Sequence, residues 1–210
     1  MSNSSLVNYT KLSPNKSNRT AKISKITIHH MAGNLSVETC GEVFAPASKQ
    51  ASSNYGIGTD GRVGLYVEEK NRAWTSSNSE NDNMAVTIEV ANDKIGGNWS
   101  VSDKAYSKLI DLCVDICQRN GITKLNYTGD KSGNLTMHKW FAPTACPGEY
   151  LESKFPDIAN QVNKRLASNS KPSSGKLYRV QVGAFSSKAN AEKLAKELQS
   201  KGYSTIIKED

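Results

Sequence analysis

Alternating apolar and polar residues predict two strands in the first half of the chain. Lys22–His30 alternates around isoleucines and is typical of a strand that ends at two histidines. Met84–Ala91 alternates more strictly, with aliphatic residues on one face and Thr87 and Glu89 on the other. The residues with reactive or polar side chains therefore lie at the end of the first strand and on the polar face of the second.

A hairpin is predicted between these two strands. Asn54–Thr59 and Val63–Glu68 flank Asp60–Gly61, a dipeptide that favours a tight turn. Residues 56–61 also match the G-x-G-x-x-G pattern of dinucleotide sites. Such a site needs a helix to begin at the glycines, so that its N-terminus meets the pyrophosphate. Here a second strand follows, so the hairpin is favoured and nucleotide binding is rejected.

Helical periodicity predicts three helices in the same part of the chain. Ser36 can cap a short helix, and Ser102 can cap a long one that Gly121 ends. Leu151–Leu166 forms the last, with Pro156 early enough either to be tolerated or to divide it. Because strands and helices are mixed, we predict an α/β fold, a mixed central sheet flanked by helices.

Composition divides the chain into two folded parts. Residues 167–175, ASNSKPSSG, have the small and polar side chains of a linker. We predict a domain over residues 1–166, a linker over 167–175 and a small βαβ segment over 176–210, whereas residues 1–22 are expected to be irregular. The elements of the segment are expected at Leu177–Ala184, Ser187–Lys201 and Tyr203–Lys208, with Ala191, Leu194, Ala195 and Leu198 on the inner face of the helix.

Charge and cysteine content narrow the class of protein. The net charge of +7 fits either a polyanionic partner, such as an anionic cell wall, or a solvated basic surface. Cys40, Cys113 and Cys117 are expected to be core residues rather than a disulfide framework. We find no apolar targeting segment and no stretch that could span a bilayer, so we expect synthesis in the cytoplasm and no membrane insertion.

The stretch MHKWFAPTACPGEY, residues 137–150, carries two thirds of a metal site. His138 and Cys146 lie on one loop with seven residues between them. Catalytic zinc usually has three protein ligands and one open position. The remaining histidines of the chain are His29 and His30, whose side chains point to opposite faces of their strand. One of the two is expected to complete the site, and spacing alone does not say which.

Other residues have both a functional and a structural interpretation. Glu89 could be a general base beside the metal or a solvent-facing side chain. Tyr55 could donate to an oxyanion or pack in the sheet. Trp74, Trp99 and Trp140 could line a substrate groove or simply pack.

Five segments together resemble the zinc-dependent N-acetylmuramoyl-L-alanine amidases related to phage lysozyme amidases and peptidoglycan recognition proteins. They are ITIHHMAGN (26–34), SSNYGIGTDGRV (52–63), AWTSSN (73–78), VTIEVAN (86–92) and MHKWFAPTACPGEYL (137–151). The resemblance implies an amidase domain with Zn²⁺ held by His29, His138 and Cys146, and catalysis by Glu89, Tyr55 and Thr144. Some members have Lys at the position of Thr144, and many have His at that of Thr75.

The implied reaction is hydrolysis of the amide between N-acetylmuramic acid and the L-alanine of the peptidoglycan stem peptide. By resemblance, Glu89 would take a proton from zinc-activated water, and Tyr55 and Thr144 would stabilise the oxyanion. The substrate would be peptidoglycan and not nucleic acid. The absence of an export signal resembles endolysins of phages or prophages of Gram-positive hosts, which reach the wall through a holin.

The tail, residues 177–208, resembles the first half of a SPOR domain, a peptidoglycan-binding module of βαββαβ order. Because the chain stops after βαβ, we expect two copies to pair as a homodimer through this segment. Two alternatives to an amidase remain. A non-catalytic peptidoglycan-binding protein of the same fold would typically lack Cys146, and a blue-copper carrier would use Met31 or Met137 as axial ligand in an all-β fold.

Overall fold

The computed structural model describes residues 2–170, 180–203 and 205–208. The chain forms two compact units, Met1–Lys171 and Pro172–Asp210, and each is described by itself. Among the described residues, no helix is both long enough and apolar enough to cross a membrane.

A six-stranded sheet forms the centre of the first unit. Its neighbouring strands pair in parallel except at the hairpin of β4 and β5, which is antiparallel. The predicted α/β class and the predicted hairpin are therefore confirmed. In spatial order the strands are β1 (Tyr9–Thr10), β5 (Val63–Leu65), β4 (Tyr55–Ile57), β7 (Ala85–Val90), β3 (Lys25–His30) and β8 (Leu135–Met137).

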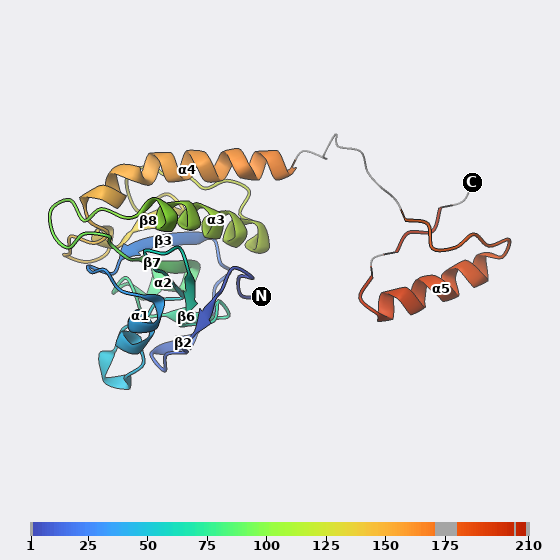
Figure 1. Cartoon of the computed structure of the whole chain (residues 1–210), viewed down its shortest axis with the longest axis horizontal. Helices are drawn as coiled ribbons and strands as arrows, with labels where there is room; N and C mark the ends of the chain where they lie inside the picture. Colours follow the sequence, from blue (N-terminus) through green and yellow to red (C-terminus); the bar gives the residue numbers. More distant parts are fainter. Residues whose placement is uncertain (1, 171–179, 204, 209–210) are drawn as a thin grey trace. The chain divides into compact units, whose positions relative to one another are not determined.

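Helices cover both faces of this sheet. Figure 1 shows α3 and α4 on one side and α1 and α2 on the other. The helices are α1 (Val37–Phe44), α2 (Ser79–Met84), α3 (Asp103–Asn120) and α4 (Glu149–Ser170), and the short helices η1 (Ala47–Lys49) and η2 (His138–Trp140) lie in loops.

The helix boundaries follow the predicted capping signals. The Ser36 and Ser102 side chains accept backbone hydrogen bonds in the first turns of α1 and α3. Gly121 ends α3 with φ of 69°, a left-handed conformation that glycine adopts without strain. α4 runs continuously past Pro156 and on to Ser170, so it occupies the start of the predicted linker.

The main core lies between the sheet and the α3–α4 layer. Val86, Ile88 and Val90 of β7 contribute to it, and so do Cys113 and Cys117 of α3. The opposite face of β7 is also shielded, because helices lie on that side as well. A polar side chain on this second face therefore loses contact with water and needs partners within the protein.

The N-terminal residues are more ordered than predicted. β1 pairs with β5, and β2 (Lys16–Asn18) pairs with β6 (Asn71–Ala73) in a separate two-stranded sheet. Arg19 donates hydrogen bonds to four backbone carbonyls far along the chain. Such short strands, fixed by distant partners, leave no periodic pattern in the sequence, and the prediction of an irregular segment was wrong.

In the described part of the second unit, the predicted helix is present and the predicted strands are not. α5 (Lys188–Ser200) is present, and the four residues expected on its inner face are half-buried. Residues 180–184 and 205–208 form no strand, and the remainder of the two predicted strands lies mostly outside the described residues. Val180 and Ile206 are 87% and 94% exposed, so within the described part of this unit the apolar flanks lack cover.

Candidate metal centre

The sheet register brings three site residues into one row. β3 and β7 pair so that His29 lies beside Glu89, and β3 and β8 pair so that Ile28 lies beside Met137. His138, the next residue after β8, therefore reaches the level of His29. The site thus follows from strand order and pairing, because these residues are far apart in sequence.

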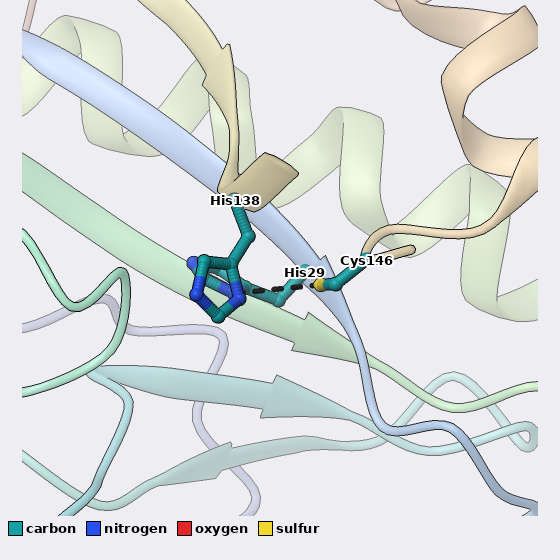
Figure 2. A group of neighbouring side chains, drawn as sticks. All are labelled: His29, His138 and Cys146. Carbon is teal, nitrogen blue, oxygen red and sulfur yellow. Dashed lines mark hydrogen bonds between the residues drawn. The ribbon is translucent and has the colours of Figure 1, made fainter. Parts of the chain in front are cut away.

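Cys146 completes the group from the loop before α4. Figure 2 shows His29, His138 and Cys146 pointing toward one another from β3, from the end of β8 and from this loop. Within the group, Cys146 Sγ is 3.6 Å from His29 Nδ1, and the rings of His29 and His138 have centroids 4.7 Å apart. One ligand atom from each residue lies within 4.8 Å of the others.

These separations fit tetrahedral zinc. Bonds of about 2.3 Å to sulfur and about 2.05 Å to nitrogen, at a tetrahedral angle, place the two atoms about 3.6 Å apart. The observed Sγ–Nδ1 distance is 3.6 Å. Two imidazoles and a thiolate are also the ligand types that zinc accepts. The residues present therefore fit this metal by donor type and by spacing.

Burial sets the protonation preferences of the group. Burial, together with the neighbouring rings of His138 and His30, lowers the pKa of His29 well below its ordinary 6.5. A neutral imidazole is the form that binds a metal. Burial and then the nearby Glu89 raise the pKa of the Cys146 thiol, whereas a hydrogen bond from the backbone of His30 lowers it. A bound cation would favour the thiolate, because its charge offsets both opposing effects.

Three polar atoms at the centre lack hydrogen-bond partners although they are buried: His29 Nε2, His138 Nε2 and Glu89 Oε2. Buried polar groups in folded proteins are nearly always paired. Unpaired buried atoms of this kind are therefore typical of a site that takes further groups, such as a metal ion or ordered water.

Glu89 is not the solvent-facing residue of the structural interpretation. Its side chain is only 13% exposed, and its Oε1 lies 4.0 Å from His29 Nδ1. Burial raises the pKa of Glu89 to about 8. A carboxyl group with a pKa near neutrality can both accept and return a proton at physiological pH.

The loop that carries Cys146 is fixed by backbone contacts. Lys139 N donates to the Cys146 carbonyl at 3.0 Å, and Cys146 N donates to Thr144 Oγ1 at 3.2 Å. Gly148 has φ of 83°, and a Cβ there would lie 3.1 Å from His30 Nδ1, so the close approach of loop and strand requires glycine. Thr144 itself is exposed, with its hydroxyl beside the ligand loop.

The structure does not bring Tyr55 to this centre. Tyr55 pairs with Ile88, so its side chain lies on the face opposite Glu89 and is fully buried. Its hydroxyl donates to Glu69 Oε1 at 2.7 Å and accepts from Ser4 N at 2.9 Å. The prediction of a catalytic Tyr55 is corrected here, because strand parity directs the phenol into the core.

Other predicted candidates also have structural partners. His30 makes an edge contact with Trp99 at 5.3 Å on the far side of the strand from His29. The Trp74 Nε1–H donates to Ser17 Oγ at 3.2 Å, and Trp140 stacks on Tyr127.

The copper alternative loses its axial ligand. Met137 lies in register with Ile28 and is buried in the main core, on the face away from His29. Met31 packs instead with the cluster of Cys40, Phe44 and Tyr66. The helices on both faces of the sheet also exclude an all-β copper fold.

Sequence reasoning missed the polar residues behind the centre. A second row of side chains lies two residues earlier on each strand. It consists of Thr27, Thr87 and Thr136, which are all fully buried. Asn81 and Asp82 of α2 are buried there too. Strand alternation points to Thr27 and Thr87, but only the strand order shows that the three threonines are neighbours.

Fold and site together define an α/β protein in which two histidines and a cysteine with metal-ligand spacing lie beside a buried carboxyl group. The chain belongs to the family described as N-acetylmuramoyl-L-alanine amidase, which matches residues 19–149. Residues 174–210 match the SPOR domain.

The known proteins that resemble this chain match it over only part of its length or at low sequence identity. A sporulation-specific N-acetylmuramoyl-L-alanine amidase of Bacillus subtilis is 32% identical over 98 residues, and the match spans 38% of this chain and 37% of that protein. Among solved structures, PlyL has a TM-score of 0.60 at 16% identity, covering 74% of this chain and 96% of that chain. The amidase LysC from Clostridium intestinale has 0.54 at 21%, covering 75% and 95%.

Proposed function

We propose that this protein is a zinc-dependent peptidoglycan hydrolase that cleaves the amide between N-acetylmuramic acid and L-alanine of the stem peptide. The observation that carries the proposal is the convergence of His29, His138 and Cys146 beside Glu89, whose buried carboxyl group has an unpaired oxygen. Family membership supports the same reaction. A non-catalytic wall-binding protein would need neither the three ligands nor a buried acid with an unpaired oxygen.

His29, His138 and Cys146 would hold the metal, which when bound supplies a Lewis acid and lowers the pKa of water to about 7. Glu89 takes one proton from the attacking water. As the carbon–nitrogen bond breaks, Glu89 returns this proton to the leaving amine of L-alanine. Burial raises the Glu89 pKa to about 8 without the metal, and a bound cation would lower it again, which favours the carboxylate form that accepts the proton. We assign Thr144, exposed on the ligand loop, a hydroxyl donor role toward the oxyanion.

We further propose that the protein is a phage or prophage endolysin of a Gram-positive host, released to the wall by a holin. An endolysin amidase, LysCS from Clostridium intestinale, has a TM-score of 0.53 at 20% identity and supports the assignment through its shared fold. The SPOR match supports wall binding by the C-terminal unit.

Pairing of two C-terminal units remains our prediction for that part of the chain. The second unit exposes apolar side chains that a partner would cover, including Val182, Tyr203 and Ile206. Sedimentation of the full chain should give a dimer, and a chain ending at Leu166 should give a monomer. If both sediment as monomers at micromolar concentration, pairing is rejected.

Purified cell walls provide the direct test of the amidase. The protein should lower wall turbidity and release new N-terminal alanine, a chelator should stop both, and added zinc should restore them. Glu89→Gln is the matched variant, because it keeps the shape and the zinc ligands but removes the base. Wall binding without new N-terminal alanine, in zinc-loaded wild-type protein, would favour the non-catalytic alternative.

A further inference from the structure

Hydrogen bonds join the row of threonines behind the metal centre to α2. The hydroxyls of Thr136 and Thr27 are 2.9 Å apart, and either can be the donor. Thr27 Oγ1 also accepts a hydrogen bond from Asn81, whose Nδ2 lies 3.0 Å away.

The Ser76 hydroxyl fixes the orientation of the Asn81 amide. The second hydrogen of Nδ2 points to Ser76 Oγ at 3.2 Å. Ser76 Oγ gives its own proton to Asp82 Oδ1 at 2.6 Å, so it can only accept from the amide. Both donor positions of Asn81 are used, and its oxygen faces away from Thr27 and Ser76.

Two buried atoms without partners belong to Asn81 and to the metal centre: the Asn81 Oδ1 and the His29 Nε2. Among the described residues, the buried side-chain oxygens without a partner are Asn81 Oδ1 and Glu89 Oε2. His29 presents Nδ1 to Cys146, so the other ring nitrogen, Nε2, carries the hydrogen when Nδ1 binds a metal. Nε2 is buried and also lacks a partner.

Asn81 contacts the strand that carries His29. Thr27 and His29 are two residues apart on β3 and therefore point to the same face. Asn81 contacts Thr27 directly. His138, in contrast, lies beyond the end of β8, in the short helix η2.

We infer that Asn81 is a positioning residue whose Oδ1 accepts the Nε2–H of His29 through one bridging water. This contact would hold the ring in the tautomer that leaves Nδ1 free for the metal, as outer hydrogen bonds commonly do for histidine ligands. The inference rests on the metal centre of the proposed function. It assigns α2 a role in metal affinity rather than in the chemical step.

The test measures zinc affinity and stability of the full chain separately. Zinc dissociation constants come from competition with a chromophoric chelator, and stability comes from urea unfolding of the metal-free protein. Asn81→Ala should weaken zinc binding by about 10–100-fold, the usual effect of losing such a partner. Asn81→Asp keeps an acceptor oxygen but loses the amide donors, so it should be destabilised yet bind zinc at least as tightly as wild type.

Asn163→Ala is the matched control. Asn163 is also held by two hydrogen bonds, accepting from Leu125 N at 2.7 Å and donating to the Leu125 carbonyl at 2.8 Å, away from the metal centre. It should lose stability without losing zinc affinity.

Three results would overturn the inference: Asn81→Ala binding zinc within threefold of wild type, Asn163→Ala losing as much affinity as Asn81→Ala, or no zinc binding by wild type. Wild-type protein that binds zinc but releases no N-terminal alanine would reject the amidase and leave the role of Asn81 intact.

Discussion

Replacing Tyr55 by Phe separates the role implied by family resemblance from the one that the structure assigns. The substitution keeps the buried ring and removes only the hydroxyl. That hydroxyl donates to Glu69 at 2.7 Å and accepts from Ser4 N at 2.9 Å. Glu69 is fully buried, receives two hydrogen bonds from Arg119 and forms an ion pair with it.

The expected cost follows from these two contacts. A hydrogen bond to a charged group contributes about 1.5–3 kcal/mol, and one between neutral groups contributes about 0.5–1.5 kcal/mol. Tyr55→Phe should therefore lower the free energy of unfolding by about 2–4 kcal/mol. Because small domains are stable by about 5–15 kcal/mol, most of the variant should remain folded. An oxyanion donor, in contrast, would lower kcat by about 10²–10³-fold when lost.

Urea unfolding and hydrolysis of a soluble muramoyl peptide by zinc-loaded, folded protein distinguish the two roles. We expect lower stability and a kcat within about threefold of wild type. Tyr106→Phe is the control, because its hydroxyl donates to Asp157 at 2.7 Å at the protein surface and should contribute less than about 1 kcal/mol. Unchanged stability with a hundredfold loss of kcat would refute the placement of Tyr55 in the core.

The remaining predictions concern the metal centre. Cys146→Ser should lose zinc and hydrolysis together, as measured by metal analysis and wall turbidity; zinc-free wild-type protein that still hydrolyses walls would contradict this. His29→Ala should abolish zinc binding and His30→Ala should leave most of it, and the reverse result would mean that the faces of β3 are misassigned. Glu89→Gln should retain zinc and lose about 10²–10⁴-fold in activity, whereas near-normal turnover would exclude a general base. In metal-free wild type, the raised Glu89 pKa means that the folded state holds a proton that the unfolded state releases, so the contribution of Glu89 to stability should fall as pH rises from about 4.5 to about 8. Urea titrations of wild type and Glu89→Gln isolate this contribution: the stability of wild type relative to the variant should fall across this range, and a constant difference would contradict the origin of the shift.

The sequence predicts most elements of the amidase domain because their signals are local. Ser36, Ser102 and Gly121 mark helix ends at the residues where the structure has them. The alternation of Met84–Ala91 also separates Glu89 from the aliphatic face, as the structure confirms. A strand or helix cap that depends only on residues adjacent in sequence can therefore be predicted without knowledge of the fold.

Features that depend on pairing between distant segments could not be predicted in this way. The role of Tyr55 depends on its register with Ile88 rather than with Glu89, which a sequence match cannot supply. The N-terminal strands and the contact of Asn81 with Thr27 likewise join segments more than 50 residues apart. For the ligand, resemblance favours His29 over His30, and the strand faces now give that choice a physical basis.

Because side chains alternate between the two faces of β3 and β7, correct packing of the core also places the residues of the metal centre correctly. On both strands the aliphatic residues face α3 and α4, while His29 and Glu89 face the other way. A slip of one residue during folding would press the imidazole and the carboxyl group into the hydrocarbon layer and turn Ile28 and Ile88 toward the site. Burying those ionisable groups in an apolar layer would cost several kcal/mol. A misaligned sheet is therefore unstable even in the absence of a metal. An extra residue in a loop does not change which face of the strand each side chain lies on. An extra residue within β3 would reverse the faces beyond it, and either the isoleucines or His29 would then lie on the wrong face.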